Sequence, residues 1–519
     1  MKIVNSKQML DIETEACNHG ISQNRLMENA GLGIARRVRM HLGNLAPNNI
    51  IILVGSGNNG GDGLIAAKYL KMWGAAVLVY LCSNRKESYP NIANLEKLGV
   101  QIKSFSSDRQ LTELQSALSK SSVLIDGVMG TGLSRPIKGD ILTIFELIRK
   151  NENESLYIIS IDVPSGLNSD TGDSDNHSIH SNLTLTLGYP KIGLYLNQGP
   201  TLTGTVGILD IGIPKKVIPQ SNITLISMSW AKSVIPNRPK NAHKGTFGKT
   251  LIVGGSKFYS GAPYLAGMAS ARSGVGLVTL AVTNTLQQSI STLSPVPTYL
   301  PLSEFSNDTN VSQNIQIILE KINKYQSILI GPGSGTSTET QNFFQQLMDK
   351  NQNLPPTVLD ADAINMLSQR NPQDWWSNLN PETILTPHLA EFSRLAKLSI
   401  EKIKTDKIKF ALELAIRSKT IIILKGPNTI VAMPTGTAFI SPFANPSLAT
   451  AGTGDVLAGI IAGFLAQGLS PQSASQLGVF VHGISGEYVN CKYGDQGSIA
   501  SDLLAYIPKT IDLIRNHNS

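Results

Sequence analysis

A chain of 519 residues is long enough for two or three domains, each with its own core. A composition of 41% hydrophobic and 16% charged residues is typical of a globular protein and excludes a disordered chain. The net charge of +7 is modest and the basic residues are dispersed, so we expect phosphorylated small molecules as ligands and no nucleic-acid partner.

The cysteines and the apolar segments bear on the compartment. Cys17, Cys82 and Cys491 are far apart and form neither a CxxC motif nor a metal-binding spacing, which predicts a reduced, cytoplasmic protein. The first residues lack the apolar segment of a signal peptide. The longest apolar run, residues 456–465, is interrupted by two glycines, so we expect no membrane partner.

The chain begins with predicted helices and a βαβ unit. Apolar residues at helical spacing predict helices within residues 7–42. Residues 49–54 are almost all apolar, as in a strand buried on both faces, and lead into a glycine-rich loop at 55–63. A helix over 64–73 and a strand over 76–81 complete the unit.

The glycine-rich loop contains the pattern GxGxxG at Gly55, Gly57 and Gly60. A dinucleotide-binding fold also needs an acidic residue at the end of the next strand to hold a ribose, and that acid is missing. Two asparagines and an aspartate among the glycines suit a phosphate and a bound alkali cation, since hard cations take oxygen ligands. A tight turn with asparagine in the left-handed conformation is the alternative.

Two further apolar strands each end in an aspartate that precedes a glycine-rich loop. Asp126 follows residues 122–125, and Asp162 follows residues 157–161. Because ligands bind at the carboxyl ends of strands in open α/β sheets, these loops predict one shared site. Taken alone, either aspartate is more often a helix cap.

These three motifs, in this order, resemble the YjeF N-terminal domain, the NAD(P)H-hydrate epimerase, over roughly residues 10–220. The resemblance implies a Rossmann-like α/β domain that interconverts the R and S hydrates of reduced nicotinamide. It also implies a substrate site made of Asn58, Asn59, Gly60, Gly61, Asp62, Gly130, Thr131, Gly132, Leu133, Ser134, Arg135 and Pro136.

The same resemblance implies that Asn59, Asp126 and Ser165 hold a potassium ion and that Asp162 contacts the substrate near the reacting ring. Opening and closing the C6–O bond requires proton transfer without redox chemistry. We therefore predict Asp162 as one acid–base group, and Lys191 as a weaker candidate for the second.

Polar residues and prolines predict a domain boundary between residues 215 and 240. We assign residues 1–220 to the first domain, 221–239 to a linker and 240–519 to the second domain. Strand and helix patterns alternate again beyond the linker, which predicts a second doubly wound sheet. No GxxxxGK[ST] loop occurs, so a P-loop enzyme is excluded.

Near its end the chain reads Ala451-Gly452-Thr453-Gly454-Asp455, followed by apolar residues at helical spacing. The N–H groups at such a helix start favour an anion, and Gly452 and Gly454 let the backbone approach a ligand. Asp455 then either takes a proton from a hydroxyl group that attacks phosphorus or caps the helix. Lys425, or the backbone near it, is a second candidate contact for a nucleotide.

An ordered set of motifs resembles the YjeF C-terminal domain, the ribokinase-like NAD(P)H-hydrate dehydratase, over about residues 240–515. The motifs are His243-Lys244-Gly245 with Gly248, Gly254-Gly255-Ser256, Ser260-Gly261-Ala262-Pro263, Gly331-Pro332-Gly333, Thr386-Pro387-His388 with Glu391, Lys425-Gly426 and Ala451–Asp455.

By this resemblance, the hydrate contacts Ala262, Gly333, His388 and Asp455, and the nucleotide, ADP or ATP, contacts Lys425, Gly426, Pro427, Asn428, Thr429 and Gly454. Asp455 would remove the proton of the C6 hydroxyl group, which then attacks the terminal phosphoryl group. Mg²⁺ would bridge the phosphates, with Asp360 and Asp362 as candidate ligands. His388 taken alone is more often structural.

The sequence thus predicts two three-layer αβα domains, Rossmann-like and ribokinase-like, in a bifunctional repair enzyme that acts on NADHX or NADPHX with ADP as co-substrate. An ordinary kinase with an appended Rossmann-like domain is the alternative among enzymes, and a binding protein is the alternative outside them. Whether the chain forms a homo-oligomer stays open.

Overall fold

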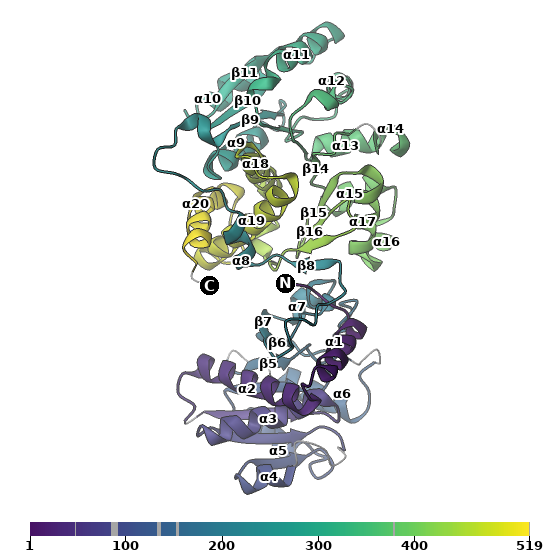
Figure 1. The fold of residues 1–519 in the computed structure, drawn as a ribbon, viewed down its shortest axis with the longest axis vertical. Coiled ribbons are helices and arrows are strands. Elements are labelled where there is room, and N and C mark those ends of the chain that lie inside the picture. The colour runs from purple at the N-terminus through teal and green to yellow at the C-terminus, as the bar shows by residue number, and fades with distance from the viewer. Residues whose placement is uncertain (47, 85–91, 132–135, 152–154, 377–378, 518–519) are drawn as a thin grey trace. The chain divides into compact units, whose positions relative to one another are not determined.

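The structure is a computed structural model that describes the chain except residues 47, 85–91, 132–135, 152–154, 377–378 and 518–519. The chain divides into two compact units, Met1–Ser221 and Asn222–Ser519 (Figure 1). Each unit is a parallel or mostly parallel sheet covered by helices, so both belong to the α/β class.

The sheet of the first unit has the strand order β3-β2-β1-β4-β5-β6-β7, and every neighbouring pair is parallel. The order reverses between β1 and β4, as in Rossmann-like folds, where ligands bind at this reversal. The strands are β1 (Asn49–Val54), β2 (Ala76–Leu81), β3 (Gln101–Ser104), β4 (Val123–Gly127), β5 (Tyr157–Ile161), β6 (Leu183–Leu187) and β7 (Thr205–Leu209).

Both faces of this sheet are covered because β1 is apolar at every internal position. Ile50 and Ile52 belong to one core, with residues of α2 and α3, whereas Ile51 and Leu53 belong to another, with residues of α5 and α6. The result is three layers. The helices are α1 (Ser6–Asn18), α2 (Gln23–Leu42), α3 (Asn58–Met72), α4 (Ile92–Lys97), α5 (Thr112–Leu118), α6 (Asp140–Lys150), η1 (Ile192–Tyr195) and α7 (Gly199–Leu202).

Helix α3 begins at Asn58, six residues before the helix start predicted from the sequence, so the second half of the expected loop is helical. Glycine disfavours a helix by about 1 kcal/mol per residue, so propensity alone favours a loop here. Close packing outweighs this cost, since a Cβ atom on Gly63 would lie only 3.2 Å from Ile52 Cγ2 of β1.

The second unit contains a ten-stranded sheet in the order β11-β10-β9-β12-β13-β14-β15-β16-β17-β8, parallel from β11 to β15. Its order reverses between β9 and β12. The strands are β8 (Ile223–Leu225), β9 (Lys249–Val253), β10 (Leu277–Thr283), β11 (Thr298–Leu302), β12 (Ser327–Ile330), β13 (Thr357–Leu359), β14 (Thr383–Leu385), β15 (Ile421–Leu424), β16 (Ile430–Ala432) and β17 (Ala438–Ile440).

The segment 221–239, assigned to a linker from the sequence, contains β8 and α8 (Met228–Val234). Strand β8 pairs with β17, and the buried Ala231 of α8 lies in the core of the second unit. A three-residue strand is too short to show an alternating hydrophobic pattern in the sequence, and the neighbouring prolines favour a loop prediction.

One face of the second sheet packs on α9 and α18, which approach each other closely. A Cβ atom on Gly459 of α18 would lie 2.2 Å from the backbone oxygen of Ala266 of α9. The remaining helices are η2 (Lys244–Phe247), α9 (Gly261–Arg272), α10 (Asn284–Ser291), α11 (Asp308–Lys321), η3 (Ile322–Lys324), α12 (Thr338–Met348), η4 (Asn351–Asn353), α13 (Asp362–Gln369), α14 (Pro372–Trp376), α15 (Leu389–Ala396), α16 (Ile400–Thr405), α17 (Lys407–Ser418), η5 (Pro446–Leu448), α18 (Thr453–Ala466), α19 (Pro471–Tyr493) and α20 (Ala500–Asn516).

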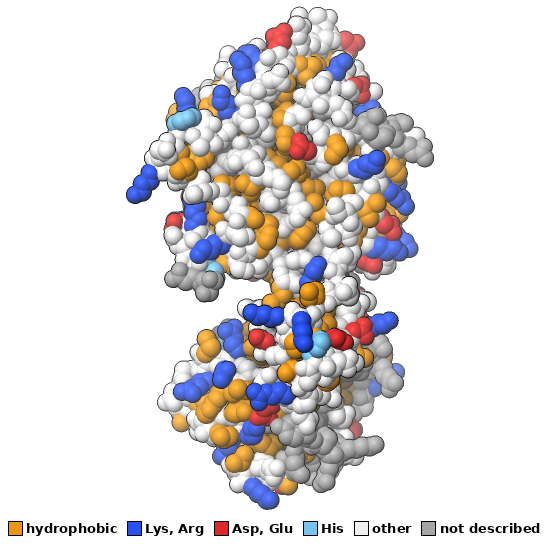
Figure 2. Space-filling view, in the orientation of Figure 1, with side chains coloured by type: hydrophobic (Ala, Val, Ile, Leu, Met, Phe, Trp, Pro, Cys, Tyr) orange, Lys and Arg blue, Asp and Glu red, His pale blue; other side chains and the backbone are white. Residues whose placement is uncertain are grey.

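The surface of each unit is mixed in charge. On the face shown in Figure 2, Lys and Arg side chains are scattered over each unit and do not gather in one basic patch. Among the helices that the structure describes, none combines the length and the apolar character that crossing a membrane requires.

Candidate active sites

The first candidate site lies at the carboxyl ends of β1, β4 and β5. Asn59, in the first turn of α3, donates from its side-chain amide to the backbone oxygens of Met129 (2.7 Å) and Ile161 (2.9 Å). These bonds tie the start of α3 to the loops after β4 and β5. A Cβ atom on Gly130 would lie 3.3 Å from Asn59 Cγ, so glycine permits this approach. The three segments predicted to share a site therefore meet.

Asp126 of β4 is fully buried beneath this meeting point. Its carboxylate accepts hydrogen bonds from Ser165 Oγ (2.6 Å), Ser160 Oγ (2.8 Å) and the backbone N–H groups of Ser165 (2.9 Å) and Val128 (3.2 Å). Burial raises the pKa of Asp126, and these hydrogen bonds oppose the rise. Among the described residues, no cationic side chain forms an ion pair with it.

Asp162 follows β5 directly and has a positive φ of 64°, which is uncommon for a residue other than glycine. It forms an ion pair with Lys191, whose side chain is 1% exposed. Its Oδ1 atom also accepts from Leu187 N (3.0 Å) and Thr186 Oγ1 (3.2 Å). All of these contacts use Oδ1, and Oδ2 takes part in none of them. The two predicted acid–base groups are therefore direct partners.

The sequence analysis did not single out Glu13, which lies on α1 near this ion pair. Burial raises the pKa of Glu13, and the charges of Lys191 and Asp162 act on it in opposite directions. Helix α1 packs over the Lys191 segment, because a Cβ atom on Gly188 would lie 3.2 Å from Met9 Cε, one helical turn before Glu13. An acid beside the buried apolar positions of an amphipathic helix was the signal that could have revealed it.

The other residues predicted to bind the epimerase substrate fall in two groups. Asn58, Gly60, Gly61 and Asp62 lie in the first two turns of α3, where all but Asn58 are buried. Of the second segment, Gly130, Thr131 and Pro136 lie in the loop after β4, and Gly132, Leu133, Ser134 and Arg135 lie outside the described residues.

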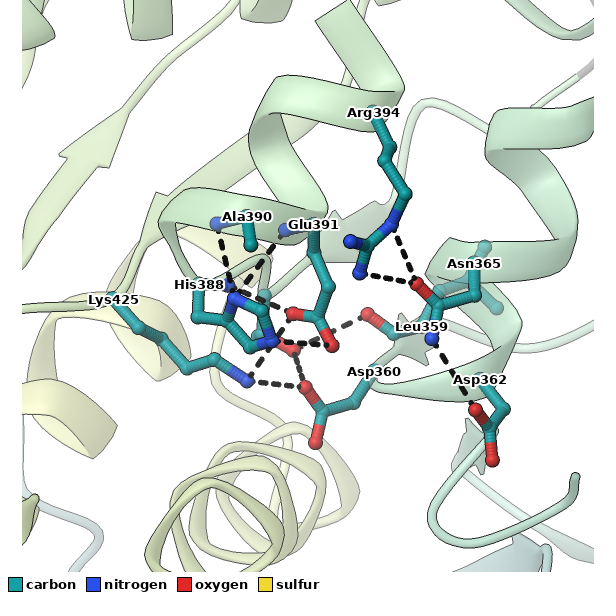
Figure 3. A network of polar contacts seen from close by, with 10 residues as sticks. Leu359, Asp360, Asp362, Asn365, His388, Ala390, Glu391, Arg394 and Lys425 are labelled. Carbon is teal, nitrogen blue, oxygen red and sulfur yellow. Dashed lines mark hydrogen bonds and ion pairs between the residues drawn. The ribbon is translucent and has the colours of Figure 1, made fainter. Parts of the chain in front are cut away.

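The second candidate site lies at the carboxyl ends of β13, β14 and β15, where Lys425 and Asp360 form a buried ion pair (Figure 3). Lys425 Nζ lies 2.8 Å from Asp360 Oδ1 and 3.9 Å from Glu391 Oε2. Thr386 Oγ1 donates to the same Asp360 oxygen over 2.7 Å. Burial alone lowers the pKa of Lys425, but the neighbouring carboxylates outweigh burial and raise it above its usual value.

His388 caps helix α15, which is a structural role. Its Nδ1 atom accepts from the N–H groups of Ala390 (3.1 Å) and Glu391 (3.3 Å), so the hydrogen of the neutral ring is on Nε2, 3.3 Å from Glu391 Oε1 (Figure 3). Burial and the charge of Lys425 lower the pKa of His388. Burial raises the pKa of Glu391 to about 7. The imidazole ring is half exposed and remains accessible to a ligand.

Asp455 lies in the first turn of α18, after the N-cap residue Gly452 with its φ of 90°. Burial, followed by the charge of Asp360, raises the pKa of Asp455 to about 7, although Lys425 opposes this. A Cβ atom on Gly454 would lie 3.2 Å from Lys425 Nζ. The amide-lined helix start and the buried ion pair are therefore parts of one site.

The remaining predicted residues of the second unit lie on adjoining segments. Gly333 (φ 63°) contacts the start of α9, because a Cβ atom there would lie 3.0 Å from Ala262 Cβ. Residues 426–429 form the turn between β15 and β16, in which Gly426 and Pro427 are exposed and Thr429 Oγ1 donates to the backbone oxygen of Gly426 over 3.0 Å. Asn428 is buried with a φ of 51°.

Fold and site together define a two-domain α/β enzyme: a Rossmann-like unit followed by a ribokinase-like unit whose helix start presents amides and a carboxylate of raised pKa. Residues 23–193 match the family described as YjeF-related protein N-terminus, and residues 250–509 match the family described as NAD(P)H-hydrate dehydratase.

Curated relatives match along almost the whole chain. A bifunctional NAD(P)H-hydrate repair enzyme of Dictyoglomus turgidum is 35% identical over 531 residues, covering 100% of both chains. One of Moorella thermoacetica is 34% identical over 490 residues, covering 93% of this chain and 91% of that protein. The chain belongs to the family of bifunctional NAD(P)H-hydrate repair enzymes.

A solved structure supports the fold of the second unit. The ADP/ATP-dependent NAD(P)H-hydrate dehydratase of Bacillus subtilis, co-crystallised with ATP and Mg²⁺, is 28% identical and superimposes with a TM-score of 0.50 over 56% of this chain and 99% of that one. A ribokinase-like superfamily protein of Enterococcus faecalis is 25% identical, with a TM-score of 0.50 over 58% of this chain and 99% of its own.

Proposed function

We propose that this chain repairs hydrated NAD(P)H in two steps, one in each unit. Residues 1–220 interconvert the R and S hydrates, and residues 240–519 dehydrate the S hydrate at the expense of ADP. The observation that carries the proposal is Asp455, a half-buried carboxyl group with a pKa of about 7, one residue after the Gly454 amide. This is the value that a general base needs at neutral pH.

In the dehydration, Asp455 takes the proton of the C6 hydroxyl group as its oxygen attacks the terminal phosphorus of ADP, and AMP leaves. The phosphate ester then loses phosphate from C6 and a proton from C5, which restores the dihydropyridine ring. Ala262, Gly333 and His388 position the hydrate beside Asp455, since these segments adjoin the same end of the sheet. Catalysis of this kind depends on positioning and electrostatic stabilisation.

The nucleotide phosphates lie against the N–H groups at the start of α18, with the turn Lys425–Thr429 beside them. Of the two carboxylates predicted for Mg²⁺, Asp360 is committed to Lys425 and Thr386. Asp362 accepts from Gly335 N (2.9 Å) and Asn365 Nδ2 (3.3 Å) and forms no ion pair with a described residue, so its charge is the one that a metal would neutralise. When bound, Mg²⁺ supplies positive charge that neutralises the phosphates.

In the epimerisation, the Oδ2 atom of Asp162 faces the C6 hydroxyl group. A proton assists departure of the oxygen as water, the ring nitrogen forms the C6=N bond, and a water molecule adds to the opposite face while giving up one proton. Water and protons balance. The ion pair with Lys191 holds the Asp162 carboxylate in place for this transfer.

A potassium ion fits the Asn59–Asp126–Ser165 cluster by its chemistry. The residues offer amide, carboxylate and hydroxyl oxygens, which are the ligands that hard cations prefer. Asp126 is 0% exposed and has four hydrogen-bond donors but no cationic partner among the described residues, so a cation would offset the part of the burial cost that the hydrogen bonds leave. A potassium ion held by these residues would supply that charge and tie together the loops after β4 and β5.

The test is to give the full chain a mixture of R and S hydrates with ADP and to follow the absorbance of the reduced nicotinamide. We expect both isomers to be converted. An ordinary kinase would consume nucleotide without restoring the coenzyme, and a binding protein would do neither.

The three cysteines are free, which supports the proposal that the enzyme works in the cytoplasm.

A further inference from the structure

A buried histidine, His482 of α19, lies directly behind the helix start of the second site. Its Nε2 atom is 3.0 Å from the backbone oxygen of Thr453, the first residue of α18. A carbonyl oxygen only accepts hydrogen bonds, so Nε2 carries the hydrogen and donates it. Burial lowers the pKa of His482 to about 4, so the ring is neutral at pH 7.

The carbonyl that His482 binds belongs to the same peptide group as the N–H of Gly454. In a trans peptide the C=O and N–H bonds point in opposite directions, so fixing one fixes the other. The Gly454 N–H is one of the first N–H groups of α18, which have no partner within the helix. A hydrogen bond on the carbonyl also strengthens the N–H as a donor, because bonded peptide groups polarise one another.

The turn needs such an anchor because glycines flank Thr453 on both sides. Gly452 has a φ of 90°, and glycine has more backbone freedom than other residues. The Thr453 side chain is held as well, since its Oγ1 atom lies 2.8 Å from the backbone oxygens of both Leu448 and Thr450 and shares its one hydrogen between them. Thr453 is therefore the fixed point of the turn.

Helix α19 is a rigid support for the imidazole ring. A Cβ atom on Gly478 would lie 2.5 Å from Ile461 Cγ1 of α18, and one on Gly483 would lie 2.2 Å from Phe443 Cδ2. These close approaches fix the backbone of α19 on both sides of His482, and the His482 side chain itself is buried, with 9% exposed.

We propose that His482 is a positioning residue of the dehydratase: it holds the Thr453–Gly454 peptide group so that the Gly454 N–H points at a phosphate of the nucleotide. The inference rests on the proposed contact between Gly454 and the nucleotide. His482 itself touches no phosphate and transfers no proton.

The test compares two amides at position 482 in the full chain. In His482→Gln the amide nitrogen reaches the place of Nε2, whereas in His482→Asn the shorter side chain does not. We expect ADP affinity, measured by calorimetry, to fall about 10-fold in the Asn variant, equivalent to about 1.4 kcal/mol, and to stay within about two-fold in the Gln variant. Ser485→Ala is the matched control: Ser485 lies on the same helix as His482, and the substitution removes its hydrogen bond to Thr510 of α20. This variant should bind ADP with normal affinity.

A general disturbance of the fold would act differently. It would weaken the binding of adenosine, which has no phosphate, as much as the binding of ADP. It would also affect the Gln and Asn variants alike. Either result overturns the proposal, as does unchanged ADP affinity in the Asn variant. The kinetic form of the effect is a higher KM for ADP, with a smaller change in kcat.

A separate measurement tests the contact on which the inference rests. With ¹³C-carbonyl threonine and ¹⁵N-glycine, only the five Thr-Gly pairs of the chain give a correlated signal, and one of them is Thr453-Gly454. We expect ADP to shift this signal in the unmodified chain. If it does not shift, the nucleotide contact is wrong; if it shifts while the Asn variant binds ADP normally, only the role of His482 is wrong.

Discussion

Replacing Asp455 with asparagine should separate the two activities of the chain. General base catalysis typically contributes 10²–10⁴-fold, so we expect dehydration of the S hydrate to fall by about that factor. R/S interconversion, which belongs to the other unit, should be unchanged and serves as an internal control. In the unmodified chain the dehydration rate should rise with pH up to about 7, the pKa to which burial brings Asp455, as the carboxylate forms.

The same substitution should stabilise the second unit. A carboxyl group whose pKa rises from 3.8 to about 7 on folding destabilises the folded state once it ionises, by at most about 4 kcal/mol. The cost is absent below pH 3.8, where both states are protonated, and reaches its full size above pH 7. The gain in the free energy of unfolding of Asp455→Asn should therefore grow between about pH 4 and pH 7 and stay constant above that.

Urea unfolding at several pH values measures this gain, and coupled release of phosphate and reduced nicotinamide measures the activity. Retained dehydration would refute the role of Asp455 as the base. Lost dehydration with no gain in stability at pH 8 would show instead that the carboxylate is well solvated in the folded chain, and the argument from its raised pKa would fail.

Three further substitutions test the other polar groups. Asp162→Ala should let the R hydrate persist while the S hydrate is still consumed, as chromatography of both isomers would show; equal consumption beyond the spontaneous rate would contradict this. Lys425→Met should lower the free energy of unfolding of the second unit by about 3–5 kcal/mol, because it leaves Asp360 buried without its cation, and the double variant with Asp360→Asn should recover much of the loss in denaturant titrations. Asp126→Asn should abolish any potassium dependence of epimerisation; a potassium response equal to that of the unmodified chain would place the ion elsewhere.

The strands that carry the sites could be predicted because their signals are local. Runs such as residues 49–54 are apolar at every internal position, and a polar residue at the end of each run marks the edge where ligands bind. The start of α3 was predicted wrongly, because glycine propensity is local and the packing against Ile52 is not. Strand β8 was hidden for a similar reason, since only its pairing with β17 makes it a strand.

The ion pairs were beyond prediction from the sequence alone. Lys425 and Asp360 are 65 residues apart and meet because β13 and β15 end at the same edge of the sheet. A sequence motif identifies each residue as polar and well placed, but it does not say which polar residues neutralise one another. The partnership between His482 and Thr453, 29 residues apart, belongs to the same class of long-range contact.

The two aspartates proposed for catalysis have different surroundings, and this difference suits their reactions. Asp162 has Lys191 as a direct partner. Burial raises the pKa of Asp455, as do the charges of Asp360, Asp362 and Glu391, whereas the charge of Lys425 lowers it. A nucleotide brings further negative charge to Asp455, which by itself would raise its pKa and weaken it as a base at neutral pH. In the proposed nucleotide site the amides of the α18 turn would face that incoming charge, and their correct orientation would then protect the ionised form of Asp455 when the hydroxyl group loses its proton. Disturbing the orientation of the Gly454 peptide group, as in His482→Asn, should therefore move the pH dependence of dehydration to higher pH and also weaken the binding of ADP.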